Sequence, residues 1–89
     1  MNTISFDFDQ IADVPDFYRQ FTRKFAIEMA FGANLDALWD ALTGMIELPA
    51  HVTFRHLDQH KDAQQFAGII AVLREAEAEL NGKFSLRIR

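Results

Sequence analysis

The chain has 89 residues, of which 49% are hydrophobic, including nine Phe, and this composition predicts one folded domain over residues 1–89. It has no Cys, which excludes disulfides, thiolate catalysis and zinc-thiolate sites. The formal net charge of -4 at pH 7 argues against nucleic acid as a direct ligand and favours a basic protein partner. No apolar run approaches the roughly 20 residues that cross a membrane, and the N-terminus does not resemble a signal peptide, so we expect a cytoplasmic protein.

The first two predicted elements are a strand and a helix. Residues 3–8 alternate between apolar and polar side chains, which predicts a strand with one buried face. A helix is expected to begin at Asp13, with Pro15 tolerated in its first turn. Its apolar positions recur at intervals of four, at Phe17, Phe21 and Phe25. Such a stripe could form a helix-binding groove or a lipid-facing surface, but the helical spacing favours core packing.

The stretch NLDALWDALTG, residues 34–44, predicts a short amphipathic helix. Asn34 is a good N-cap because its side-chain oxygen can accept from a free amide of the first turn. Gly44 is expected to end the helix in a left-handed conformation. At roughly 100° per residue, one stripe of leucines is expected to be buried: Leu35, Leu38 and Leu42.

The polar face of this helix is acidic. Asp36, Asp40 and Thr43 share the exposed face, and Trp39 lies at its boundary. Two carboxylates at i, i+4 repel each other by a few tenths of a kcal/mol, so a cationic partner would gain more from this face than folding does. The alternatives are an ordinary solvated helix and a catalytic carboxylate pair, but the sequence shows no nucleophile motif or phosphate loop to accompany such a pair.

The second half of the chain predicts a strand, a helix and a strand. Residues 51–54 form the strand, with His51 exposed, and residues 55–61 are ambiguous. Asp62 can cap a long helix that ends at Asn81-Gly82, and its apolar stripe comprises Phe66, Ile69, Ile70, Leu73, Ala76 and Leu80. The last strand alternates, with Phe84, Leu86 and Ile88 on one face. The fold class is therefore α/β: a three-stranded parallel sheet with helices mainly on one side. We expect the first strand to be central.

Two further groups of polar residues need an interpretation. His56 and His60 lie at i, i+4 with Asp58 between them, but zinc would need another protein ligand and a second shell. The sequence points to neither, so solvated residues on a turn are favoured and no metal or cofactor is predicted. Glu75 and Glu79 share one face of the long helix, whereas Glu77 is expected to be solvated.

The segment from Asn34 to Gly44 closely resembles the acidic inhibitory helix of the barstar family, intracellular inhibitors of a small secreted bacterial ribonuclease. The similarity continues through Pro49, through Arg74-Glu75-Ala76 with Glu79, and into the strand after Gly82. It implies a barstar-like fold. It also implies that certain residues contact the ribonuclease: Asn34, Asp36, Trp39, Asp40 and Thr43. In the family, the position matching Asp40 stands in for a substrate phosphate, and the position matching Glu75 supports it.

The chain departs from the family at the rim of this surface. Neighbouring tyrosines before the helix are replaced by Ala30-Phe31, and a tryptophan after it is replaced by Met45. Phe31 and Met45 lie where the family places partner contacts. The predicted partner-binding residues are thus Phe31, Asn34, Asp36, Trp39, Asp40, Thr43, Met45, Glu75 and Glu79.

The sequence and the resemblance together predict a stoichiometric inhibitor, not an enzyme. Its target would be a basic, secreted-type bacterial ribonuclease, and the acidic helix would plug the active-site cleft. The free protein is expected to be a monomer. The changed rim keeps one alternative open, a barstar-fold binding module whose partner is a different basic protein or toxin domain.

Overall fold

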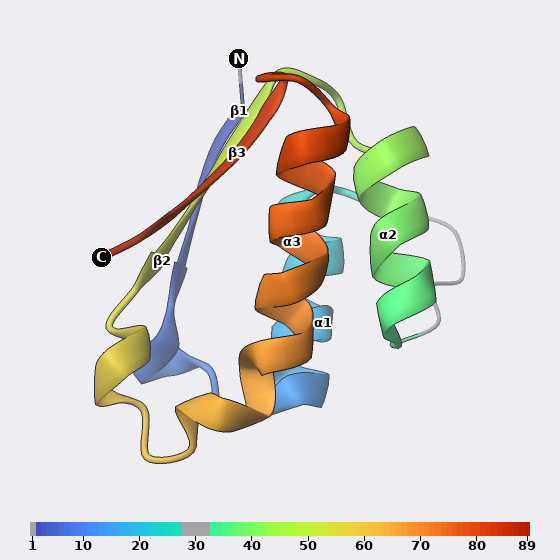
Figure 1. Ribbon diagram of the computed structural model, residues 1–89. Helices are drawn as coiled ribbons and strands as arrows, with labels where there is room; N and C mark the ends of the chain where they lie inside the picture. Colours follow the sequence, from blue (N-terminus) through green and yellow to red (C-terminus); the bar gives the residue numbers. More distant parts are fainter. Residues whose placement is uncertain (1, 28–32) are drawn as a thin grey trace.

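A three-stranded parallel sheet forms one layer, and the α-helices pack on one of its faces (Figure 1). The computed structural model describes residues 2–27 and 33–89. The strands are β1 (Asn2–Asp7), β2 (Ala50–Arg55) and β3 (Phe84–Ile88). The predicted fold class is confirmed. Within the described residues, no helix is long and apolar enough to span a membrane.

The predicted strand order is wrong, because β2 and not the first strand is central. Ile4 pairs with Val52, and Val52 pairs with Leu86, so the order β1-β2-β3 follows the sequence. In a right-handed crossover, the direction in which the chain moves along the sheet determines which face of the sheet its helix covers. Two successive crossovers in the same direction therefore place all their helices on one face, which is the observed arrangement.

The sheet buries the face that the alternating pattern predicted. Phe6, Phe54 and Phe84 are fully buried. Phe8 lies just beyond β1, in a 3-10 helix (Phe8–Gln10), and is buried there. Ile88 differs from the prediction, since it is 41% exposed at the free end of an edge strand.

The first helix, α1 (Val14–Lys24), begins as predicted. The side chain of Asp13 accepts a hydrogen bond from the Asp16 amide at 3.0 Å, and Pro15 lies in the first turn. Phe17 and Phe21 are buried, and the Phe17 ring centroid lies 5.0 Å from that of Phe6 on β1. The phenylalanine stripe is therefore core packing, which holds α1 against the sheet.

The long helix, α3 (Ala67–Glu79), follows a 3-10 helix (Ala63–Phe66). Asp62 stands before that 3-10 helix, but its side chain makes no capping hydrogen bond, so the predicted cap is wrong. The stripe itself is confirmed: Phe66, Ile69, Leu73 and Ala76 are buried, and Ile70 and Leu80 are half-buried. Asn81 and Gly82 end the helix with φ of 50° and 87°.

Candidate protein-binding surface

The acidic helix, α2 (Leu35–Gly44), is held firmly at its start and along its inner side. Asn34 Oδ1 accepts a hydrogen bond from the Ala37 amide at 2.8 Å, as the sequence predicted. Leu38, Ala41 and Leu42 are fully buried. In Figure 1, α2 runs alongside α3 and forms the outer side of the helical layer. The core contacts thus fix the orientation of the opposite, polar face.

Leu35 is not buried as predicted but 42% exposed. It stands in the first turn of α2 and lies over Gly68 of α3, where an added Cβ would come within 3.1 Å of Leu35 Cδ1. The leucine therefore rests on the surface of α3 and does not enter the core. Glycine at position 68 leaves the space that this close contact needs.

Gly44 also differs from the prediction, because it is the last residue of α2 and does not adopt a positive φ. The helix ends through the carbonyl of Ala41, which accepts hydrogen bonds from the amides of both Met45 and Ile46 at 3.0 Å. A left-handed residue is not needed to satisfy that carbonyl. Met45 follows directly and is 44% exposed.

The carboxylates of Asp36 and Asp40 are exposed on the outer face of α2. Within residues 2–27 and 33–89, neither takes part in a hydrogen bond or an ion pair. Trp39 is half-buried and packs against the core from the boundary of this face. Thr43 is half-buried, and its hydroxyl donates to the Trp39 carbonyl at 2.8 Å. The oxygen of Thr43 can still accept a hydrogen bond from a partner.

The neighbouring helix α3 adds Glu75 and Glu79, both exposed. We call Asp36, Asp40, Glu75 and Glu79 the acidic surface. It combines negative charge from two helices that pack together, without a basic side chain paired to any of the four in the described residues. Such a surface can bind cationic groups. Phe31, also predicted to contact the partner, lies outside the described residues.

Glu77 was expected to be solvated but is half-buried, and its carboxylate takes part in specific contacts. Its carboxylate accepts a hydrogen bond from the Leu86 amide at 3.0 Å and pairs with Arg74 at 3.2 Å. Arg74 in turn donates to the Leu86 carbonyl at 2.9 Å. The two side chains therefore satisfy the amide and the carbonyl of Leu86, which hinders pairing of another strand at that part of the edge.

The two histidines considered for a metal pair point to different partners. The His60 Nε2 atom lies 2.8 Å from the Ile11 carbonyl, and its Nδ1 accepts from the Asp62 amide at 3.0 Å. Both ring nitrogens of His60 are thus hydrogen-bonded to the backbone, and neither is available to bind a metal ion. His51, expected to be exposed, is half-buried and hydrogen-bonded to Ser85.

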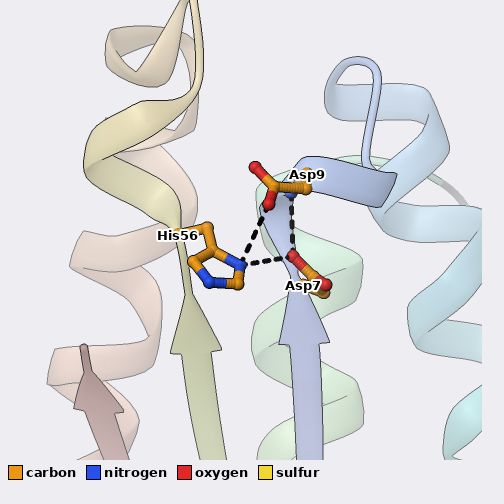
Figure 2. Close-up of side chains that lie close together, drawn as sticks. All are labelled: Asp7, Asp9 and His56. Carbon is orange, nitrogen blue, oxygen red and sulfur yellow. Dashed lines mark hydrogen bonds and ion pairs between the residues drawn. The ribbon is translucent and has the colours of Figure 1, made fainter.

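His56 instead turns toward two aspartates at the end of β1 (Figure 2). Its Nδ1 lies 2.8 Å from Asp7 Oδ1 and 3.2 Å from Asp9 Oδ2. The hydrogen bond between His56 and Asp7 lowers the pKa of Asp7 and raises the pKa of His56. The sequence analysis did not predict this cluster. It could have been predicted from the adjacent parallel strands β1 and β2, because their carboxyl ends meet at the same edge of the sheet.

Comparison with known proteins agrees with this geometry. The family model described as Barstar (barnase inhibitor) matches residues 1–88. The chain is also similar to the "Putative ribonuclease inhibitor YrdF" of Bacillus subtilis (strain 168), with 32% identity over 81 residues that cover 85% of this chain and 71% of that protein. Both descriptions name inhibitors and not enzymes. The chain therefore belongs to the Barstar family and is not an enzyme.

Proposed function

We propose that this protein is a stoichiometric inhibitor of a basic bacterial ribonuclease, and that α2 plugs the active-site cleft of that enzyme. Family membership and the name of the Bacillus subtilis relative support a ribonuclease as the target. The proposed binding mode rests on one observation: Asp36 and Asp40 project from α2 without a partner in the described residues, while Leu38, Ala41 and Leu42 anchor the inner side of the helix in the core. The proposal includes a monomeric free protein, folded as one domain, in the cytoplasm of the producing bacterium.

The energetic argument concerns where the two carboxylates gain most. On an isolated helix their i, i+4 spacing costs a few tenths of a kcal/mol, and no cation in the described part of the chain offsets it. A ribonuclease cleft holds cationic groups that bind phosphate. A carboxylate that enters this cleft meets those groups away from water, where each interaction is stronger than at the surface. Asp40, in the middle of α2, is the residue we assign to the phosphate subsite.

The remaining surface residues complete the contact. Asn34 uses its Oδ1 as the cap, which leaves its amide hydrogens free to donate to the enzyme. Trp39 and Met45 offer apolar area beside the charges, and aromatic residues are common anchors of such interfaces. Glu75 and Glu79 would meet basic groups at the rim of the cleft.

The test is a titration of a basic, guanyl-specific bacterial ribonuclease with the purified protein. We expect activity to fall linearly to zero at a 1:1 ratio, because a plugged cleft admits no substrate. Asp40→Ala should abolish tight inhibition. Asp58→Ala is the matched control, since Asp58 is also exposed but lies in the segment after β2, outside the acidic surface. Equal loss of inhibition in both variants would reject α2 as the binding element.

A second candidate is a barstar-fold module that binds a different basic protein or toxin domain. The observation that favours it is the rim, where an exposed Met45 stands in place of the tryptophan of barstar. The apolar part of the surface therefore differs while the acidic part is kept. A pull-down from the host proteome with wild type and Asp40→Ala separates the two candidates. Specific capture of a basic protein without ribonuclease activity would favour the second.

A further inference from the structure

A second cluster of chemically active side chains lies at the carboxyl ends of β1 and β2, outside the acidic surface. Asp7 is the last residue of β1, Asp9 follows in the 3-10 helix, and His56 follows the last residue of β2. Figure 2 shows the three side chains pointing toward one another across the two neighbouring strands. In Figure 1, this end of the sheet and α2 lie on opposite sides of the molecule, with α3 between them.

The spacing of the three donor atoms is close to that of ligands around one metal ion. Two ligands at metal distances of about 2.1 Å lie about 3.0 to 3.4 Å apart when the angle between them is octahedral or tetrahedral. The His56 Nδ1 lies 2.8 Å from Asp7 Oδ1 and 3.2 Å from Asp9 Oδ2. All three donor atoms lie within 4.8 Å of one another. Small side-chain rotations would therefore bring them onto one ion.

His56 can donate a hydrogen bond to only one of the two carboxylates at a time. Nδ1 of an imidazole carries at most one hydrogen, yet it faces both Asp7 and Asp9. One cation placed between the three atoms would bind both carboxylates and the nitrogen at once. The Asp9 amide also donates to Asp7 Oδ1 at 3.0 Å. This second-shell contact orients the carboxylate, as outer contacts do in established metal sites.

We propose that Asp7, Asp9 and His56 bind one first-row divalent transition-metal ion, with Zn²⁺ as the best match. An imidazole nitrogen with two carboxylate oxygens suits this class of ion, whereas Mg²⁺ and Ca²⁺ prefer all-oxygen sites. The side chains of His56, Asp7 and Asp9 are 34%, 39% and 49% exposed. Water can therefore complete the coordination, and the ion has free access from solvent.

The site would cross-link the ends of two strands and lie apart from the acidic surface. Bound Zn²⁺ should therefore stabilise the folded state, because it binds the folded chain better than the unfolded one. Inhibition of a ribonuclease should not change. This inference does not depend on the proposed function, and either can fail without the other.

The experiment is isothermal titration calorimetry of the chelator-treated protein with ZnCl₂ and, separately, with MgCl₂. We expect one Zn²⁺ per chain and no binding of Mg²⁺. His56→Asn, which tolerates the left-handed backbone at this position (φ 62°), should weaken Zn²⁺ binding by about tenfold or more. Asp9→Asn should do the same, and its exposed position makes misfolding a poor explanation. His51→Asn is the matched histidine control and should bind like wild type.

Thermal unfolding with and without ZnCl₂ gives an independent readout. Zinc should raise the unfolding temperature of the wild type and of His51→Asn, but not that of His56→Asn or Asp9→Asn. Absence of Zn²⁺ binding to the wild type would overturn the proposal and leave the cluster as an ion pair. Binding that survives both His56→Asn and Asp9→Asn would overturn it as well, because the ion would then sit elsewhere.

Discussion

Asp40 differs from Asp36 in its place on α2 more than in its chemistry. Asp36 lies in the first turn, whereas Asp40 lies one turn further along, between Asp36 and Thr43. A ligand that reaches Asp40 must cover the whole polar face. Asp40→Ala should therefore cost more binding free energy than Asp36→Ala or Glu79→Ala. Loss of one partner from a buried ion pair costs about 3–5 kcal/mol in general, and we expect a value in that range from calorimetric titration with the ribonuclease.

The same substitution should leave the fold intact. Asp40 makes no contact that the fold requires within the described residues, and its removal relieves the i, i+4 repulsion with Asp36. The free energy of unfolding in urea should be unchanged or higher by a few tenths of a kcal/mol. If Asp40→Ala instead lowered stability and spared binding, α2 would not be an inhibitory helix, and the family likeness would be one of fold alone.

Trp39 provides a direct optical probe of the proposed interface. It is the only tryptophan of the chain, and it is half-buried at the boundary of the acidic surface. Its emission should shift or quench when a partner covers this face, because the exposed part of the ring loses contact with water. The measurement is a fluorescence titration from which the emission of the partner is subtracted. Unchanged emission at saturation would place the interface elsewhere.

The residue-level predictions were correct where interactions within one helix determine the position of a side chain. Asn34 caps α2, and Asp36 and Asp40 are exposed, because capping and the 3.6-residue period depend on neighbours in the sequence. They failed where a distant element decides. Leu35 rests on Gly68, and Glu77 bonds to Leu86, contacts that no local pattern encodes.

Glu77 contributes a polar contact between α3 and β3. Glu77 accepts from the Leu86 amide and also pairs with Arg74. Glu77→Ala should lower the free energy of unfolding by about 1–2 kcal/mol, since a hydrogen bond to a charged group is lost and the edge of β3 is opened. Glu75→Ala is the control, because Glu75 is exposed on the same helix and makes no such contact within the described residues. Its effect in urea unfolding should be close to zero. Equal stabilities would show that the contact is dispensable.

The start of α1 predicts an acid-sensitive contribution to stability. Asp16 accepts from the Ala12 amide at 2.9 Å and pairs with Arg19 at 2.7 Å. The hydrogen bond from Ala12 is the main cause that lowers the pKa of Asp16 below its ordinary value of 3.8. A group with a depressed folded-state pKa stabilises the fold above its unfolded value and loses this contribution as the pH falls through the folded value.

The measurement compares wild type with Asp16→Asn. The wild type should have the larger free energy of unfolding at pH 6, and the difference should shrink as the pH falls below 3.8. Urea unfolding at a series of pH values gives the curve. A difference that stayed constant across this range would show that ionisation of Asp16 does not contribute.

The strand order illustrates a prediction that the sequence could have supported more fully. The alternating strands indicated one solvated sheet face, so helices on one side were expected. With right-handed crossovers, that expectation requires the order β1-β2-β3, whereas a central first strand would send α3 to the opposite face. The two expectations were therefore incompatible. The strand order follows from the handedness of the crossovers and not from the local sequence pattern.

At the scale of the whole molecule, four carboxylates of α2 and α3 gather negative charge on one part of the surface. The acidic surface lies on the helical layer, whereas exposed arginines, among them Arg55, Arg87 and Arg89, lie at or just beyond the ends of β2 and β3. A basic enzyme that approaches α2 and α3 from outside meets the attraction of the acidic surface. This local gathering of negative charge should therefore orient the encounter as well as accelerate it.

This orientation predicts a strong dependence of association on salt. As the ionic strength rises from about 0.01 to 0.15 M, the Debye length falls from about 30 to 8 Å, so attraction between the acidic surface and the enzyme is screened before contact. The association rate constant, measured by stopped-flow fluorescence, should fall steeply over this range while the dissociation rate changes little.

The double variant Asp36→Ala/Asp40→Ala should associate more slowly at low salt and respond less to added salt. Arg87→Gln, which lies on the sheet, should keep the dependence of the wild type. A rate that is independent of salt would mean that apolar contacts around Trp39 and Met45 drive recognition. It would favour the second candidate function, binding of a different protein, over a ribonuclease bound through its phosphate site.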